Sequence, residues 1–295
     1  MGKDMNYTIK NDFYTATVST TGAELISLIA DGRECIWDGK QEFWGDRAPL
    51  LFPICGQIKD KEYKYADKKY KMNGHGFARR EEFTVIEKSE SKITLCLKEN
   101  ENTLSQYPFS FELYAAYELS GDSLLIDFTV KNTKNEIMPY MFGWHPGFML
   151  FEDGGACIND YYVDFGKMTK LDMHPLQNGP FASPVSEEYP LDDGKIRICE
   201  EYLYPRDTMI MINHENSCTL GSEKNTYRVF VEWSKNLPVL ALWKADDSRA
   251  KFLCIEPWTQ MPADGVSEEN FETRKMERLR CGEKATYSYK VKIAF

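Results

Sequence analysis

The chain of 295 residues could hold one large domain or two ordinary ones, and its 42% hydrophobic and 14% aromatic residues exclude a disordered protein. Its net charge of −10 argues against a general nucleic-acid-binding protein, which needs a basic face to displace counterions. The eight cysteines stand at wide intervals, with no C-x-x-C and no Cys/His pair at zinc-ligand spacing, so we expect reduced, mostly buried thiols.

The amino-terminal segment, MGKDMNYTIKNDFYT, has no apolar core of the kind that a signal peptide needs. No later run of the chain approaches the length of a membrane span. Together with the reduced thiols, this pattern predicts a cytoplasmic protein with no membrane partner.

Three segments alternate apolar and polar residues with period two, namely KITLCLK (Lys92–Lys98), LLIDFTVKN (Leu124–Asn132) and YSYKVKI (Tyr287–Ile293). Because side chains alternate across a strand, each segment is predicted to be a half-buried strand with one wet face. Turn signals punctuate the chain at short intervals, and the charged segment Ser267–Arg280 is the best helical candidate. With no linker and no internal repeat, the pattern predicts an all-β protein: one large antiparallel β-sandwich with few short helices.

Two histidines stand in unusual local contexts. His75 lies between two glycines in NGHGFA (Asn73–Ala78), and His145 lies between Trp144 and a proline in FGWHPGF. Either His75 is a polar residue of an ordinary turn, or the flanking glycines allow a backbone conformation that presents its side chain to a ligand. His145 is either a packed core histidine or part of a sugar site, since a pyranose has apolar faces and a hydroxyl rim.

The remaining histidines, His174 and His214, lie among polar, loop-like residues and are expected at the surface. Glu256 ends the apolar run FLCIEPWT and is followed by a proline and Trp258. It is either a buried ion-pair partner or a general base at the end of a strand, where partial desolvation raises its pKa. Trp258 could then form an aromatic wall of the same cleft.

Three motifs occur together in one order. NGHGFAR, FGWHPGF and CIEPW resemble the aldose 1-epimerase (galactose mutarotase) family, and most closely its bacterial LacX-like branch. Further similar segments are TTGAELISL (Thr20–Leu28) and RAPLLFPICG (Arg47–Gly56), so the resemblance covers essentially residues 1–295 as one aldose 1-epimerase-like domain.

The resemblance implies a large twisted β-sandwich of the galactose mutarotase type, with an open cleft and no metal or cofactor. It implies that Glu256 is the general base, that His145 is the general acid and that His75 assists at the ring oxygen. Asp207, in YLYPRDTMIM, matches a sugar-binding aspartate. The implied partner is a small-molecule sugar, without nucleic acid, and the expected state is a monomer or homodimer.

One position departs from the family pattern. Where mutarotases often carry a sugar-binding arginine, this chain has Gln57 in GQIKD, and Arg47, just upstream, could replace it. Trp144 and Trp258 are the expected aromatic contacts of the sugar. The reaction implied is interconversion of α- and β-aldohexoses by acid–base ring opening.

Two alternatives stay open. A hexose-6-phosphate 1-epimerase would need basic residues at the cleft for the phosphate, for which Arg47, Arg79 and Arg80 are available unless the last two pair with Glu81 or Glu82. A non-catalytic sugar-binding protein would use the same cleft, but binding alone does not require an acid–base pair.

Overall fold

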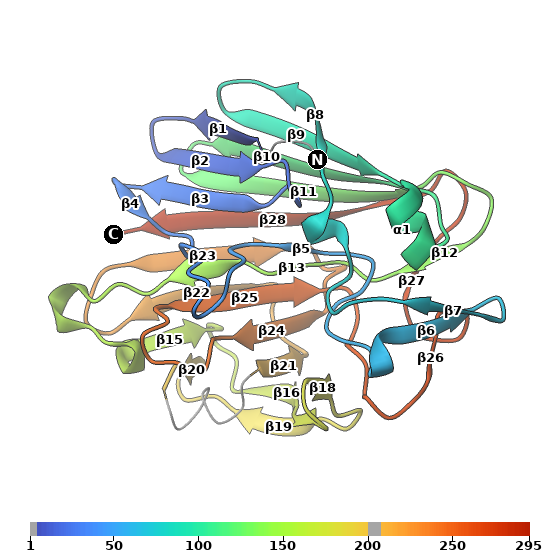
Figure 1. Ribbon diagram of the computed structural model, residues 1–295. Helices are drawn as coiled ribbons and strands as arrows, with labels where there is room; N and C mark the ends of the chain where they lie inside the picture. Colours follow the sequence, from blue (N-terminus) through green and yellow to red (C-terminus); the bar gives the residue numbers. More distant parts are fainter. Residues whose placement is uncertain (1–4, 200–207) are drawn as a thin grey trace.

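The computed structural model describes residues 5–199 and 208–295. Nine antiparallel strands form its largest sheet, which crosses the molecule in Figure 1. All three segments with period-two patterns belong to this sheet, as β9, β11 and β28. In order across the sheet the strands are β20 (Lys195–Arg197), β15 (Tyr161–Asp164), β22 (Ser217–Ser222), β23 (Arg228–Trp233), β28 (Lys284–Ala294), β11 (Ser123–Asn132), β10 (Phe111–Ser120), β9 (Lys92–Lys98) and β8 (Thr84–Lys88).

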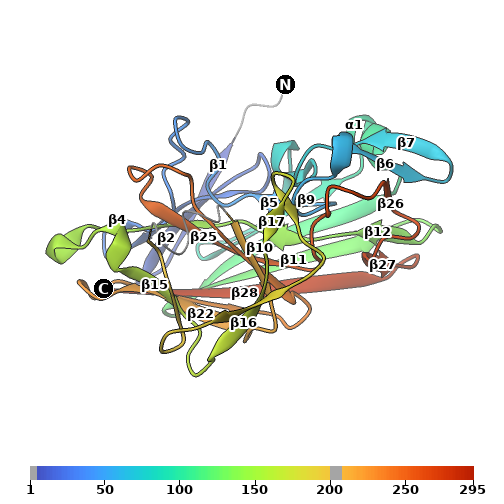
Figure 2. The same cartoon turned by 90° about the horizontal axis from the view of Figure 1, so that it is seen from below.

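A second sheet of eight strands packs against the first. Tyr287 of β28 stacks on Phe142 with ring centroids 4.8 Å apart, and Tyr289 donates its hydroxyl to the backbone oxygen of Pro257, so β28 and β25 lie in different layers (Figure 2). The strands of this second sheet are β19 (Glu187–Pro190), β16 (Lys170–His174), β21 (Thr208–Ile212), β24 (Val239–Trp243), β25 (Phe252–Trp258), β13 (Gly143–Trp144) and β5 (Leu50–Leu51), with β14 (Gly147–Met149) also paired to β25.

Smaller elements complete the described structure. A four-stranded sheet contains β1 (Asn6–Lys10), β2 (Tyr14–Ser19), β3 (Leu25–Ala30) and β4 (Arg33–Glu34). The short sheets pair β12 (Met138–Tyr140) with β27 (Glu277–Leu279), β17 (Leu176–Gln177) with β18 (Phe181–Ala182), and β6 (Glu62–Tyr65) with β7 (Lys68–Lys71) and β26 (Glu269–Asn270). The helices are α1 (Glu101–Gln106) and single turns at Lys59–Lys61, Ala78–Arg80, Asp153–Gly155 and Ile158–Asp160.

The all-β prediction is confirmed, but the helical prediction for Ser267–Arg280 is wrong. That segment forms β26 and β27 instead. Phe271 is fully buried against Tyr63, with ring centroids 3.6 Å apart, and such tertiary contacts override local helix propensity. The α-helix that does occur, α1, begins at a capping box in which Asn100 accepts a hydrogen bond from the Thr103 N–H.

Burial tests two further expectations. Five of the eight cysteines are buried and all eight are unpaired thiols, as expected. The expectation that His174 is a surface residue is wrong: it lies on β16, only 7% exposed, and its Nδ1 bonds to the backbone oxygen of Ser183. His214 is half-buried beside Trp233. No helix in the two described ranges is both long enough and apolar enough to cross a bilayer.

Candidate active site

Glu256 lies inside the fully buried strand β25, not at a strand end. The expectation that Pro257 ends this strand is wrong, because β25 continues through Trp258. Proline lacks the N–H that a central strand normally contributes to its ladder. Here Ile255 and Thr259, on either side, donate their N–H groups to the neighbouring segment, so the strand continues past Pro257 although Pro257 itself donates no ladder bond. That neighbouring segment is interrupted between β13 and β14.

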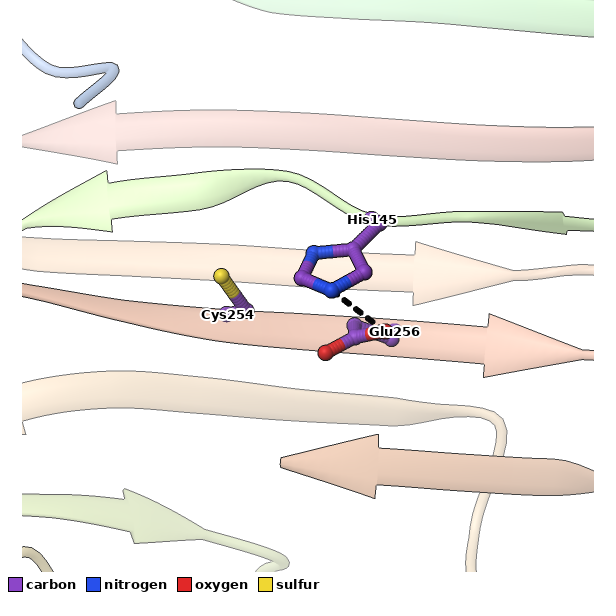
Figure 3. A group of neighbouring side chains, drawn as sticks. All are labelled: His145, Cys254 and Glu256. Atoms are coloured by element: carbon purple, nitrogen blue, oxygen red, sulfur yellow. Dashed lines mark ion pairs between the residues drawn. The ribbon is translucent and has the colours of Figure 1, made fainter. Parts of the chain in front are cut away.

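His145 occupies that interruption. It lies between β13 and β14, which both pair with β25, and its backbone N–H donates to the oxygen of Pro49 instead. Pro146 follows and cannot donate to a ladder. The break between the two short strands directs the imidazole of His145 toward Glu256, as Figure 3 shows.

The two side chains form a close buried pair. Nε2 of His145 lies 3.2 Å from Oε2 of Glu256, and the residues are 7% and 1% exposed. Burial raises the pKa of Glu256 well above its usual range and lowers the pKa of His145 well below its usual range. Because burial disfavours both charged forms, it favours a pair that shares one proton, in which one group can donate while the other accepts.

His75 has a left-handed backbone conformation, with φ of 64°. Its N–H donates to the oxygen of Gly56 at 2.8 Å, and the N–H of Gly56 donates to Nδ1 of His75 at 3.2 Å. Because Nδ1 accepts, the neutral ring carries its proton on Nε2. Burial and the charge of Arg79 lower the pKa of His75 to about 3, so this histidine is a neutral donor in a fixed orientation.

His75, His145 and Glu256 line one pocket of about 300 Å³, which is at the lower end of the size range of small-molecule sites. Three of the described residues that line it are tryptophans. Trp44 lies over the His145 ring with centroids 4.8 Å apart, and Trp243 also lines the space. Aromatic faces beside a few polar groups suit a ligand with apolar C–H faces and a polar rim, as a sugar has.

Some of the expected substrate-binding residues line the pocket and others do not. Gln57 and Trp258 line the same pocket. Arg47 does not, because its guanidinium donates to the backbone oxygen of Ile26 at 2.6 Å. Trp144 faces the interior, where its indole N–H donates to the oxygen of Ala48. Asp207 lies outside the described residues.

Residues 5–280 match the family model described as aldose 1-epimerase. The chain belongs to the aldose 1-epimerase family. Among curated proteins of this kind, it is 29% identical to the chromosomal protein LacX of Lactococcus lactis subsp. lactis, over 95% of this chain and 98% of LacX.

Solved structures place this aldose 1-epimerase family member among galactose mutarotase-like folds. A galactose mutarotase related enzyme from Lactobacillus acidophilus superposes with a TM-score of 0.93 at 31% identity, covering 99% of this chain and 98% of that one. A galactose mutarotase-like protein from Lactobacillus casei ATCC 334 gives 0.89 at 28% identity, covering 98% and 100%. The predicted galactose mutarotase-like β-sandwich is therefore confirmed.

In this member of the aldose 1-epimerase family, Arg79 lines the pocket and its Nε is buried without a hydrogen-bond partner. Pairing of Arg79 and Arg80 with Glu81 or Glu82 was the wrong expectation. Both guanidinium groups bind Asp46 instead, at 3.0 and 2.6 Å.

The pocket residues Trp44 and Trp243 were not found from the sequence. Trp44 lies in a short irregular segment. Trp243 is the last residue of an apolar strand, where the sequence pattern predicts a core residue. Neither position has a motif or a spacing that separates it from an ordinary buried tryptophan.

Proposed function

We propose that this protein is an aldose 1-epimerase that interconverts the α and β anomers of a free aldohexose. The observation that carries the proposal is the 3.2 Å contact between His145 and Glu256, in a pocket where His75 offers a neutral N–H. Glu256 is the proton acceptor, and His145 and His75 are the donors. They serve the C1 hydroxyl oxygen and the ring oxygen of the sugar, which are both bonded to C1.

The reaction needs those roles. Glu256 removes the proton from the C1 hydroxyl while His145 protonates the ring oxygen, so the bond from C1 to the ring oxygen breaks and an aldehyde forms. The C1–C2 bond rotates, and the hydroxyl formed from the ring oxygen then attacks the other face of the aldehyde carbonyl. In this closure His145 takes back a proton from that hydroxyl and Glu256 returns a proton to the C1 oxygen. His75 donates a hydrogen bond from Nε2 to the ring oxygen, where charge changes during the step.

The single proton of the pair makes this cycle reversible. Before a sugar binds, burial favours the proton on Glu256, because it raises the pKa of that carboxyl and lowers the pKa of His145. Sugar hydroxyls that donate to the carboxylate favour its ionised form, since hydrogen bonds to a charged group stabilise it. The proton can then pass from Oε2 of Glu256 to Nε2 of His145, the two atoms being 3.2 Å apart, which gives the base and acid required.

The two histidines are expected to contribute unequally. His145→Asn should lower kcat more than His75→Asn does, because His145 transfers a proton whereas His75 holds the ring oxygen by a hydrogen bond. Steady-state kinetics of both variants would measure this, with circular dichroism as the folding control. A larger loss of kcat in the His75 variant would reverse the two roles.

The pH dependence of kcat/KM is expected to be bell-shaped between about pH 5 and about pH 9. Adding a second proton to the His145–Glu256 pair blocks the base, and removing its only proton blocks the acid. His75→Asn should keep both limbs, because the pKa of His75, about 3, leaves that ring neutral throughout. A flat profile in the parent protein would contradict an acid–base pair.

A hexose-6-phosphate 1-epimerase is the second candidate, favoured by the position of Arg79. Among the described residues lining the pocket, Arg79 is the only lysine or arginine. Its charge is already paired with Asp46, which also binds Arg80. A phosphate dianion normally meets two or three charge-assisted donors, so a free aldose suits this pocket better.

Anomer exchange with a panel of aldohexoses and their 6-phosphates, followed by NMR or polarimetry, tests the proposal. We expect higher kcat/KM for free sugars such as glucose or galactose. The opposite ranking, abolished by Arg79→Ala and kept by the matched control Arg47→Ala outside the pocket, would assign the protein to hexose phosphates. Binding without any exchange would identify a non-catalytic sugar-binding protein.

A further inference from the structure

A buried thiol that the proposed reaction does not use lies beside the acid–base pair. Cys254 precedes Glu256 by two residues on β25, so the two side chains leave the strand on the same face. Figure 3 shows the thiol, the imidazole of His145 and the carboxylate grouped on that face. One ligating atom from each residue lies within 4.8 Å of the others, and all three residues are buried.

The donor set is one that zinc prefers. Zinc sites combine thiolate, imidazole and carboxylate ligands at about 2.0 to 2.3 Å, so tetrahedral ligand atoms lie about 3.3 to 3.8 Å apart. The 3.2 Å contact of His145 with Glu256 is already close to this spacing. Bringing Cys254 to this spacing needs a shift of at most about 1 to 1.5 Å. Magnesium and calcium, which require oxygen ligands, do not fit a thiolate.

Charge and hydrogen bonding favour the same cation. A thiolate, a carboxylate and a neutral imidazole balance a divalent ion, so the occupied site has no net charge in a dry interior. Oε1 of Glu256 and Nδ1 of His145 are buried and have no hydrogen-bond partner, whereas Oε2 of Glu256 has its 3.2 Å contact with Nε2 of His145. Buried polar atoms are normally satisfied, so the two unpartnered atoms indicate that this position receives a ligand.

The geometry leaves one coordination position open. His145 and Glu256 line the sugar pocket, so a fourth ligand on the ion would come from that side as water or a sugar hydroxyl. Three protein ligands with an open position are typical of accessible zinc sites. The ligands come from β25 and from the break between β13 and β14, which explains the absence of any zinc spacing in the sequence.

We propose that His145, Cys254 and Glu256 bind one zinc-like divalent cation, and that the bound cation blocks anomer exchange. The inhibitory part rests on the proposed function. On binding, the thiol proton and the proton of the His145–Glu256 pair are released to solvent, and the ion takes the lone pairs that the reaction needs. The proposed reaction itself requires no metal, so the cation is an inhibitor of the pair.

Cobalt provides a readout that does not depend on activity. Metal-stripped protein carrying Cys157→Ser and Cys281→Ser, which removes the two exposed thiols, is titrated with Co²⁺. We expect one Co²⁺ per chain with a thiolate-to-cobalt charge-transfer band that Zn²⁺ displaces. Cys254→Ser and Cys254→Ala should each abolish the band, whereas Cys218→Ser, at a buried thiol of the other sheet, should keep it. No band in the parent, or a band that survives loss of Cys254, would overturn the site.

Zinc titration of anomer exchange tests the inhibitory part. The parent should be inhibited over the same Zn²⁺ range that displaces cobalt, and Cys254→Ser should need at least ~10-fold more zinc, as for the loss of a supporting metal-site residue. Binding without inhibition would overturn this part. If metal-free protein shows no exchange with any sugar, the proposed function fails, and the cobalt spectrum still decides the metal site.

Discussion

Replacement of Glu256 by glutamine is expected to leave the fold intact and to reduce anomer exchange at least ~100-fold. The amide keeps the shape of the side chain but cannot accept a proton from the C1 hydroxyl. Burial, which raises the pKa of Glu256, favours an uncharged side chain at this position, and the amide is uncharged. Saturation-transfer NMR on the anomeric protons measures the rate, and thermal unfolding checks the fold.

Glu269→Gln is the matched control for this change. Glu269 is also a buried carboxylate, 5% exposed, but it pairs with Arg274 and lies outside the pocket that Glu256 lines. Its variant should keep most of the activity while losing some stability. If Glu256→Gln retains more than about a tenth of the parent rate, Glu256 is not the general base.

The second large effect is expected from Gly76→Ala, next to His75. Gly76 has φ of 72°, and a Cβ at this position would overlap the backbone oxygen of Phe52. The left-handed conformation costs a residue with a Cβ about 1 to 2 kcal/mol, and forced displacement of packed backbone costs about 1 to 3 more. We expect a loss of about 3 kcal/mol in the free energy of unfolding, together with a displaced His75 and a lower kcat.

Gly32→Ala separates the cost of the left-handed conformation from the cost of the overlap. Gly32 has the same φ of 72°, but beyond its chain neighbours no heavy atom lies within 4 Å of the added Cβ. This variant should lose only the conformational part, about 1 to 2 kcal/mol, and keep full activity. Denaturant unfolding of both variants gives the comparison. Equal losses of stability would show that Phe52 moves away freely and that the geometry of His75 does not depend on a glycine.

The strands of the large sheet were predictable because one face of each is exposed to solvent. In β11, Ile126, Phe128 and Val130 are buried while Asp127 is exposed, so the alternation is visible in the sequence. β25 is buried on both faces and has no alternation. Its continuation past Pro257 rests on hydrogen bonds that Ile255 and Thr259 donate to the neighbouring segment, which is a tertiary feature that no local pattern contains.

The site could be predicted only in part for the same reason. His75, His145 and Glu256 are carried by distinctive motifs, and the structure brings their side chains into one pocket. The partner of Arg79 was missed because Asp46 is 33 residues away and meets it through the fold, whereas Glu81 and Glu82 are neighbours only along the chain. Trp44 reaches His145 in the same way.

The position of β28 has a consequence for the order of folding. The β10–β11 and β22–β23 pairs are hairpins between consecutive strands and close short loops, whereas β28 must join β11, where Leu124 pairs with Val291, to β23. Closing long loops costs more entropy, and topologies dominated by distant pairings fold slowly. Insertion of β28 is thus the step that unites the two halves of the sheet. Tyr289 of β28 then supports β25 through Pro257, so the geometry of the His145–Glu256 pair should return last on refolding, after most of the secondary structure.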